Sequence, residues 1–319
     1  MSAILSFLGM AKPSFLRKKG IIGMNLRNVK YIARNNPRRL YPNVDDKFKT
    51  KLLCAEHNIA VPKLLGVCRV QGHIKELQEF LEPLPCFVIK PAQGSGGKGI
   101  LVITGRDGDK YLKTSGKPVT LDELRRHVSN ILSGLYSLGG KPDVALIEDL
   151  VRFTDAFHGF SYEGVPDIRV IVYKGFPVMA MTRLSTSNSD GKANLHQGAV
   201  GVGIDIVSGE ALRAVQFDRP LALHPDTGKA VSTLKIPNWK EVLLLAARGY
   251  EVSGMGYLGV DIVLDEERGP LVLELNARPG LAIQIANGEG LAPRLNFVDK
   301  CAKNLSPQER VDRMLEHWA

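Results

Sequence analysis

Long apolar runs are missing from the sequence: no stretch approaches the roughly 18 apolar residues that a membrane-spanning helix needs. Cysteine is scarce as well, and its four copies show neither CxxC spacing nor a nearby histidine pattern, so reduced, buried thiols are expected instead of a zinc site. They are Cys54, Cys68, Cys86 and Cys301. The N-terminus lacks basic residues ahead of its apolar stretch and shows no export cleavage pattern. We therefore expect a cytoplasmic protein.

Acidic residues are absent from the first 44 positions, which hold nine of the 42 basic residues. The rest of the chain then carries 33 residues of each sign, so the whole net charge of +9 lies in residues 1–44. Such a segment could bind anionic lipid, nucleic acid or an acidic protein. A solvated face, or a cationic wall beside an anionic substrate, is the alternative. No aromatic interleaving or recognised nucleic-acid motif supports specific nucleic-acid binding.

Helical and strand patterns alternate along the 319 residues, as in an α+β protein of two or three lobes. Asp45 and Asp46 can cap a helix in which apolar residues recur at helical spacing from Phe48 to Ile59. Further helices are predicted over 74–81, 121–136 and 239–252. Strands are predicted over 64–70, 87–90, 100–104 and 144–147 and near residue 111, and hairpins over 168–184 and 199–217.

A glycine-rich loop follows Lys90, the last residue of a predicted strand. Glycines let backbone N–H groups approach an anion closely, and lysines supply charge, which suits a triphosphate. The loop is not a Walker motif, because Gly99 follows Lys98 where Ser or Thr is needed and no helix is predicted to begin there. A flexible hairpin connection would show the same glycines. The loop reads Gln93, Gly94, Ser95, Gly96, Gly97, Lys98, Gly99.

Two strands, 257–264 and 271–276, are predicted to form the last hairpin. In the simplest register Asp261 faces Glu274, and Leu264 faces Leu271. Asn276 shares the face of Glu274, because side chains alternate between faces. The core face would carry Val260, Ile262, Leu264, Leu271, Leu273 and Leu275. Opposed carboxylates repel, so this face calls for a cation, and oxygen ligands favour Mg²⁺ or Mn²⁺; a solvated sheet face is the alternative.

The order of these motifs resembles the ATP-grasp ligases, and within them the ribosomal-S6-modification type of α-L-glutamate ligase, over about residues 45–290. The matching segments are Asp46-Lys47, Val88-Ile89-Lys90, the glycine loop, 146–151, Asp167-Ile168-Arg169, 194–198, 259–261 and 274–280. The sequence departs from that type in three places. Residues 1–44 replace a longer α/β domain, the segment from Glu148 to Asp167 is long, and Arg278 stands where a small residue is usual. This indicates a related subgroup, close also to ATP-grasp proteins associated with sugar transfer.

The resemblance implies an α+β fold in which two lobes sandwich ATP, with a shortened N-terminal region. Residues 1–44 would form a basic N-terminal arm and residues 45–151 the N-terminal and lid lobes. Residues 152–319 would form the C-terminal lobe with the metal site.

The resemblance also implies roles for individual residues. ATP would be bound by Lys47, Lys90, Gln93, Gly94, Ser95, Gly96, Gly97, Lys98, Gly99, Glu148, Asp149, Leu150, Val151, Asn194 and His196, with residues 148–151 as the adenine hinge. Mg²⁺, or Mn²⁺ in its place, would be held by Asp261, Glu274 and Asn276. Arg183 and Arg278 would stabilise the oxyanion of a tetrahedral intermediate. Arg169 is a weaker candidate, since it could simply pair with Asp167.

The implied activity is that of an ATP-dependent carboxylate-amine ligase that works through an acyl phosphate and releases ADP and phosphate. It would add glutamate or a similar amino acid. The alternatives are an ATP-grasp protein acting on a cell-envelope glycan or polymer, and a nucleotide-binding module without catalysis. The expected partners are ATP, a carboxylate, an amino-acid co-substrate, and an acidic protein or anionic surface at the basic arm. A homo-oligomer is left open.

Overall fold

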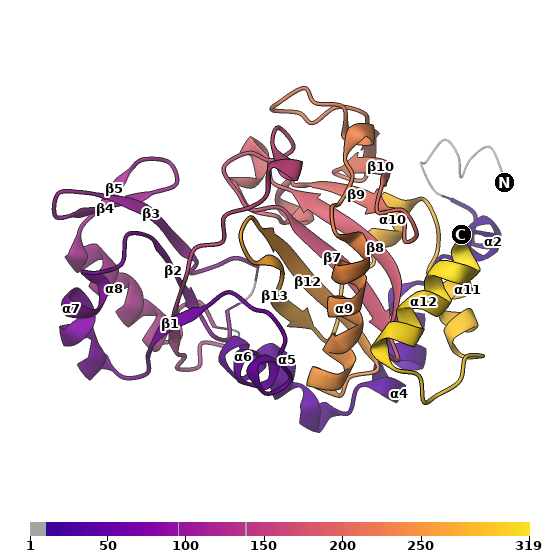
Figure 1. Ribbon diagram of the computed structural model, residues 1–319, viewed down its shortest axis with the longest axis horizontal. Coiled ribbons are helices and arrows are strands. Elements are labelled where there is room, and N and C mark those ends of the chain that lie inside the picture. The colour runs from indigo at the N-terminus through magenta and orange to yellow at the C-terminus, as the bar shows by residue number, and fades with distance from the viewer. Residues whose placement is uncertain (1–10, 95, 138) are drawn as a thin grey trace.

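Two antiparallel sheets form the framework of the computed structural model, which describes residues 11–94, 96–137 and 139–319 (Figure 1). The first sheet has six strands in the order β1-β6-β2-β3-β4-β5. Its strands are β1 (Leu64–Cys68), β2 (Phe87–Pro91), β3 (Leu101–Asp107), β4 (Lys110–Lys113), β5 (Pro118–Val119) and β6 (Ala145–Glu148).

The second sheet has seven strands in the order β11-β10-β9-β8-β7-β12-β13. Its strands are β7 (Asp167–Tyr173), β8 (Phe176–Leu184), β9 (Val200–Ile204), β10 (Ala211–Gln216), β11 (Arg219–Leu221), β12 (Tyr257–Asp265) and β13 (Gly269–Asn276). Both predicted hairpins are therefore present, and β12–β13 is the predicted last one.

The helices begin where the sequence supplies caps. Asp46 accepts hydrogen bonds from the N–H groups of Phe48 and Lys49, as predicted, and Thr120 caps α8. The predicted helix over 74–81 is instead a 3-10 turn, Gln71–Glu76, followed by α7. The α-helices are α2 (Pro13–Lys18), α3 (Met24–Leu26), α4 (Ala33–Asn35), α5 (Pro42–Asp45), α6 (Lys47–Glu56), α7 (Leu77–Leu81), α8 (Leu121–Leu132), α9 (Trp239–Ser253), α10 (Ile283–Asn287), α11 (Ala292–Val298) and α12 (Pro307–Trp318). Among the described residues, no helix is both long and apolar enough to span a membrane.

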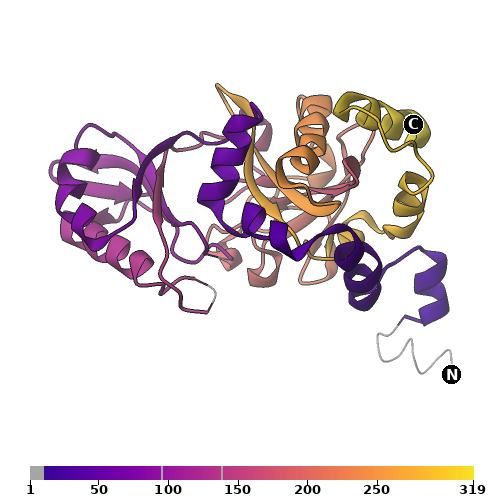
Figure 2. The same cartoon turned by 90° about the horizontal axis from the view of Figure 1, so that it is seen from below.

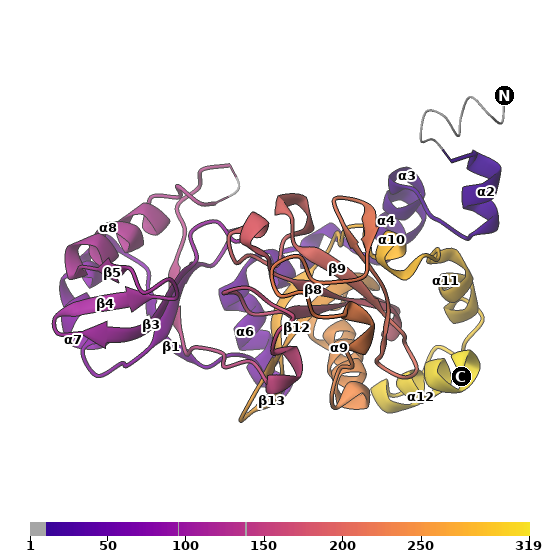
Figure 3. The ribbon, with the colours of Figure 1, turned by 90° about the horizontal axis from the view of Figure 1, so that it is seen from above.

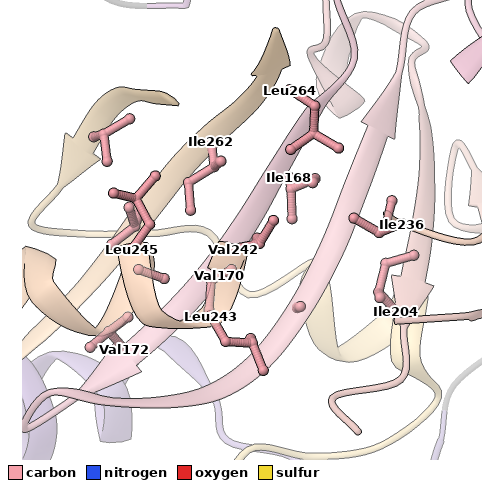
Figure 4. Close-up of a cluster of buried hydrophobic side chains, with 14 of the residues drawn as sticks. Ile168, Val170, Val172, Ile204, Ile236, Val242, Leu243, Leu245, Ile262 and Leu264 are labelled. Carbon is pink, nitrogen blue, oxygen red and sulfur yellow. The ribbon is translucent and has the colours of Figure 1, made fainter. Parts of the chain in front are cut away.

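Helix α9 covers one face of the seven-stranded sheet and closes the larger hydrophobic core (Figure 4). Val242 and Leu243 of α9 pack with strand residues such as Ile168, Val170 and Ile262, all fully buried. Burial of each such side chain contributes about 1.5–3 kcal/mol. The even-numbered positions of β7 and β12 thus face this core, which leaves their odd-numbered positions for the opposite face.

The opposite face of this sheet is covered in part by the N-terminal basic segment. Tyr31, from a π-helical turn over Arg27–Ile32, is buried with its ring centroid 5.5 Å from that of Tyr173 and 6.1 Å from that of Tyr257. Asn36 adds polar contacts: its Nδ2 donates to the carbonyls of Tyr257 (2.6 Å) and Ala277 (3.1 Å), and its Oδ1 accepts from the Tyr257 N–H (2.9 Å). Residues 22–36 are therefore part of the packing of this sheet.

The β12–β13 hairpin confirms one predicted pair and corrects another. Asp261 is paired with Glu274 as expected, but a bulge follows, so that Leu264 faces Pro270 and not Leu271. The extra residue is Leu273, which is only half-buried, whereas Val272 turns into the core beside Ile262. A single inserted residue reverses the faces beyond it.

Candidate active site

One face of the seven-stranded sheet carries a row of charged side chains that crosses four strands. Arg183 on β8 is paired with Asp167 on β7. Arg169 on β7 is paired with Asp261 on β12, and Asp261 is paired with Glu274 on β13. These odd-numbered positions of β7, β8 and β12 lie opposite the core face, so the local alternation of the sequence brings segments about a hundred residues apart into one polar row.

Asp261 is the centre of this row and is 3% exposed. Arg169 donates to both of its oxygens, from Nε at 2.7 Å and from Nη2 at 2.5 Å, and Arg183 Nη2 donates to Oδ2 at 2.7 Å. Asn276 Nδ2 adds a bond of 3.2 Å. Burial by itself would raise the pKa of Asp261, but the two guanidinium groups outweigh it and hold this pKa below its ordinary value.

Asp167 behaves differently although it lies in the same row. Burial raises its pKa, and although Arg183 opposes this by donating to both carboxylate oxygens, the Asp261 carboxylate adds to the rise. The alternative that Arg169 simply pairs with Asp167 does not hold, because Arg169 binds Asp261 and Arg183 binds Asp167.

The predicted metal ligands Asp261, Glu274 and Asn276 lie together at the end of this row. In the parts of the chain that the structure describes, no three His, Cys, Asp or Glu side chains gather as a metal cluster, so the set rests on two carboxylates and one carboxamide. Oxygen donors of this kind fit a hard divalent cation. Glu274 is the most accessible carboxylate, with 32% of its side chain exposed, whereas Asp261 is held by the arginines.

Lys47 joins the glycine loop to this carboxylate group. Its Nζ donates to the Gly94 carbonyl at 2.7 Å and lies 3.6 Å from Glu274 Oε2. Its backbone N–H donates to the Ala92 carbonyl at 2.9 Å, which fixes the start of α6 beside the loop. A candidate phosphate loop and a candidate metal carboxylate are therefore brought within the reach of one lysine.

The base of the glycine loop is held by Asp143. The Gln93 N–H donates to both carboxylate oxygens of Asp143, at 3.1 and 3.0 Å, and Ser137 Oγ donates to the same group at 2.6 Å. At the other end His127 Nε2 lies 3.0 Å from the Gly99 carbonyl. A Cβ atom at Gly99 would meet the Tyr136 ring at 2.6 Å, so this position requires glycine.

The tip of the loop lies beside a second predicted segment. A Cβ atom at Gly96 would lie 3.9 Å from Asn194 Nδ2. Asn194 caps a short turn over Leu195–Gln197 by accepting from the His196 N–H at 3.0 Å, and the side chains of His196 and Lys98 are exposed. Gly97 lies near the Lys192 side chain, and Ser95 is outside the described residues.

Glu148, at the end of β6, lies between two lysines. Lys90 Nζ is 2.7 Å from its Oε2 and Lys51 Nζ is 3.1 Å from its Oε1, and all three residues are buried. Lys51 also donates to the Pro62 carbonyl at 2.5 Å. Burial lowers the pKa of Lys51 to about 8, although Glu148 opposes the shift. Lys51 is not among the residues predicted to bind ATP, although its position one helical turn after Lys47 is a signal that points to it.

The hinge segment that follows Glu148 is fastened to the β12–β13 turn. Arg268 donates to Asp149 Oδ2 at 3.0 Å and to the Leu150 carbonyl at 3.2 Å, and it also binds Asp265 at 2.7 Å. The Asp149 N–H donates to the Lys63 carbonyl at 2.9 Å. Arg268 was not anticipated from the sequence, because a turn residue in a charged loop carries no distinguishing pattern.

Arg278 is exposed, and its guanidinium lies 5.2 Å from the centroid of the Tyr41 ring. Partial desolvation raises the pKa of Asp45, and the charges of Arg278 and Lys47 both oppose this. Within the described residues no ion pair or hydrogen bond joins Arg278 to the Asp261 row. It therefore lies on the Lys47 side of the site, apart from Arg183.

A family model of sugar-transfer associated ATP-grasp proteins matches residues 26–300. The chain belongs to this family. The predicted resemblance to the ATP-grasp proteins and the predicted α+β fold class are thereby confirmed.

Proteins with curated names resemble this ATP-grasp chain more distantly. A probable alpha-L-glutamate ligase of Aeromonas salmonicida (strain A449) is 24% identical over 83% of this chain and 67% of its own length. One of Parasynechococcus marenigrum (strain WH8102) is 27% identical over 77% of this chain and 39% of its own length. Among solved structures, the D-alanine-D-alanine ligase from Coxiella burnetii is 13% identical, with a TM-score of 0.47 over 88% of this chain and 60% of that one. The chain thus spans about two thirds of the length of the first relative and less of the others.

Proposed function

We propose that this protein is an ATP-dependent carboxylate-amine ligase that adds glutamate or a similar amino acid through an acyl phosphate. The observation that carries the proposal is the position of Lys47, which donates to Gly94 of the glycine loop and lies 3.6 Å from Glu274. One lysine thus contacts both the candidate phosphate loop and a candidate metal carboxylate, which are separate in the sequence. The curated names of the relatives support the same reaction class.

The nucleotide would lie between the two sheets. Backbone N–H groups of the glycine loop and the ammonium groups of Lys47 and Lys90 would face the phosphates. Glu148, Asp149, Leu150 and Val151 would form the adenine hinge, and Arg268 holds that hinge to the β12–β13 turn. Asn194 and His196, beside the tip of the loop, would close over the phosphates.

Asp261, Glu274 and Asn276 would hold Mg²⁺, with Mn²⁺ as the alternative. The ion would neutralise charge on the nucleotide phosphates. The chain's own cations would do the rest. Arg169 and Arg183 bring two fixed positive charges to the row, and Lys47 brings a third to the Glu274 side.

The reaction would proceed in two displacements. A carboxylate oxygen of the substrate attacks the γ-phosphorus of ATP, the bond from that phosphorus to the β–γ bridging oxygen breaks, and ADP leaves. The amine nitrogen then attacks the acyl carbon, the carbon–oxygen bond to phosphate breaks, and inorganic phosphate leaves as the amine loses a proton. Arg183, in the charged row, and Arg278, on the Lys47 side, are alternative candidates for stabilising the oxyanion between these bond changes.

Phosphate release from ATP and Mg²⁺, measured with a panel of paired carboxylates and amino acids, tests this proposal. We expect one pair to stimulate release and Glu274→Ala to lower the stimulated rate by at least about 100-fold. Glu267→Ala, which removes an exposed carboxylate of the same hairpin, is the matched control and should retain the rate. Nucleotide binding without stimulation by any pair would contradict the amino-acid ligase assignment.

A second candidate is ligation to a glycan or polymer that carries an amine or a carboxylate. The description of the family as sugar-transfer associated favours it. The same assay with amino sugars and uronic acids in the panel separates the two: stimulation by a sugar acceptor and not by free amino acids would select the glycan reaction.

A further inference from the structure

Exposed large apolar side chains are frequent near the N-terminal end of the described chain. Of the sixteen exposed large hydrophobic residues in the described parts, five fall between residues 15 and 29. Phe15 is 53% exposed, Met24 64% and Val29 66%, and Leu16 and Leu26 complete the set. Helix α2 buries none of its residues. Exposed apolar groups that gather in one place indicate an interaction site.

The same segment is strongly cationic and its charges are not neutralised. Among the described residues, none of the nine basic side chains between Lys12 and Arg39 takes part in an ion pair. Glu289 precedes Gly290, whose N–H group donates to the Lys19 carbonyl. The Glu289 carboxylate lies 3.9 Å from Arg294, which is outside this segment. We call Phe15, Leu16, Met24, Leu26 and Val29, with Lys12, Arg17, Lys18, Lys19 and Arg34, the basic apolar surface.

This surface is attached by backbone hydrogen bonds to the segment that contains α10 and α11. The Gly290 and Ala292 N–H groups donate to the carbonyls of Lys19 and Gly20, each at 3.0 Å. The Ile22 N–H donates to Gln284 Oε1 at 2.9 Å. Figures 2 and 3 show the resulting position, in which α2 and α3 lie at the end of the molecule opposite the six-stranded sheet. The cations of this end therefore do not form a wall of the site between the sheets.

We propose that the basic apolar surface docks on the surface of an anionic lipid bilayer. Exposed Phe and Leu side chains together with Lys and Arg are the combination that lies in a membrane interface, where the apolar groups enter the acyl boundary and the cations face the lipid phosphates. A nucleic acid would use the cations but leave Leu16, Leu26 and Val29 in water, since they cannot stack on bases. An acidic protein surface without apolar groups of its own would leave the same side chains unburied.

Docking on a bilayer would also affect the sheet face that carries the charged row, because Arg27 connects the N-terminal segment to the turn after β13. Buried Arg27, within the segment, donates from Nη1 to the Pro279 carbonyl at 2.7 Å, in the turn that follows Asn276. Docking would therefore fix the orientation of the end of β13 relative to the bilayer. This inference does not depend on which reaction the site performs.

Cosedimentation of the full chain with phosphatidylcholine vesicles, with and without phosphatidylglycerol, tests the proposal. We expect the chain to bind the anionic vesicles and not the neutral ones. Phe15→Ala with Leu16→Ala, and separately Arg17→Glu with Lys18→Glu and Lys19→Glu, should each lower the partition coefficient by at least about ten-fold. All five side chains are exposed, so thermal unfolding of both variants should match that of the wild type.

Matched changes elsewhere serve as controls. Val70→Ala with Leu212→Ala removes two comparably exposed apolar side chains, and Lys110→Glu with Lys117→Glu and Lys141→Glu reverses three exposed charges. Both should bind like the wild type. Failure of the wild type to bind anionic vesicles would overturn the proposal, as would equal losses in the control variants. Binding to a single-stranded RNA probe in place of the vesicles would also overturn it.

Insertion is separated from simple adsorption by tryptophan fluorescence. A Phe15→Trp variant should shift its emission to shorter wavelength and be quenched by brominated lipid when anionic vesicles are added, whereas Val70→Trp should show neither effect. Adsorption without quenching would mean that only the charges act, and the proposed docking of the apolar side chains would then be wrong.

Discussion

Two buried carboxylates, one in each sheet, are flanked by two cations each, but the cations differ. Glu148 lies between Lys51 and Lys90, and Asp261 lies between Arg169 and Arg183. The arginines donate three well-directed bonds to Asp261. By contrast, Glu148 Oε1 accepts no hydrogen bond from the described residues, although Lys51 is 3.1 Å away. The hydrogen-bonding capacity of Glu148 is therefore less completely satisfied than that of Asp261.

Lysine and arginine differ in how readily the side chain loses its proton. A lysine that is buried can lose its charge near neutral pH, as the pKa of about 8 for Lys51 indicates, whereas an arginine keeps its charge under all ordinary conditions. Lys51 can therefore lose its charge when its counter-charge is removed. The arginine group depends on carboxylates to balance it.

Removal of the central carboxylate should cost most in the arginine group. Asp261→Asn leaves Arg169 without its partner and Arg183 with Asp167 alone, so we expect the free energy of unfolding to fall by about 3–5 kcal/mol. Urea unfolding measures this. Asp190→Asn, which alters an exposed pair with Lys192, is the control and should change stability by less than about 0.5 kcal/mol. Equal stability of Asp261→Asn and the wild type would contradict the comparison.

Glu148→Gln should cost less, about 1–3 kcal/mol, because Lys51 can shed its proton once its counter-charge is gone. The measurement is the same urea titration. A loss as large as that of Asp261→Asn would show that the two lysines are as rigidly bound as the arginines.

The lysine group should also reveal itself through pH. The folded-state pKa of Lys51 is lowered from 10.5 to about 8, so between these values the unfolded chain binds more protons and wild-type stability gains from rising pH. Lys51→Met does not titrate there. The free energy of unfolding of the wild type minus that of Lys51→Met, measured by urea titration, should therefore increase from pH 8 to pH 10 by an amount on the order of 1–3 kcal/mol. Lys49→Met, which replaces an exposed lysine of the same helix, is the control. A difference between wild type and Lys51→Met that does not change with pH, or one that wild type and Lys49→Met show equally, would contradict this prediction.

The smallest effect should come from the arginine that connects the two regions. Arg268→Gln removes the hydrogen bonds from Arg268 to Asp149 and to the Leu150 carbonyl, and its ion pair with Asp265. Because the Arg268 side chain is about one third exposed, the free energy of unfolding should fall by only about 0.5–1 kcal/mol. Hydrogen exchange of the hinge amides should increase at the same time. Unchanged exchange would mean that other contacts, such as Asp149 to Lys63, hold the hinge alone.

The hairpin shows how far the sequence could predict the site. The facing of Asp261 and Glu274 followed from strand period and turn length, and the structure confirms it. The bulge could not be foreseen, because Leu271, Val272 and Leu273 are all apolar and either face could accept them. Ion pairs between residues far apart in the sequence could not be predicted either. Arg169 is two residues from Asp167 in sequence, yet it bonds to Asp261 on the neighbouring strand.

The glycine loop and Lys90 were recognisable from composition alone, and their nucleotide role remains a prediction. The supports around them were not recognisable. Asp143, His127 and Lys51 are single residues in ordinary helix or loop contexts, and only the folded chain shows that they hold the loop or Glu148.

Asn36 ties the N-terminal segment of this chain to the last hairpin. Its one carboxamide makes three hydrogen bonds to the main chain of Tyr257 and Ala277. It thereby satisfies backbone groups at the start of β12 and just after β13. A chimera that takes residues 1–44 from another protein must bring a carboxamide at this position, or the main-chain groups of Tyr257 and Ala277 lose these three hydrogen bonds. The N-terminal segment and the last hairpin therefore have to be exchanged together in such a design, although more than 200 residues separate them in the chain.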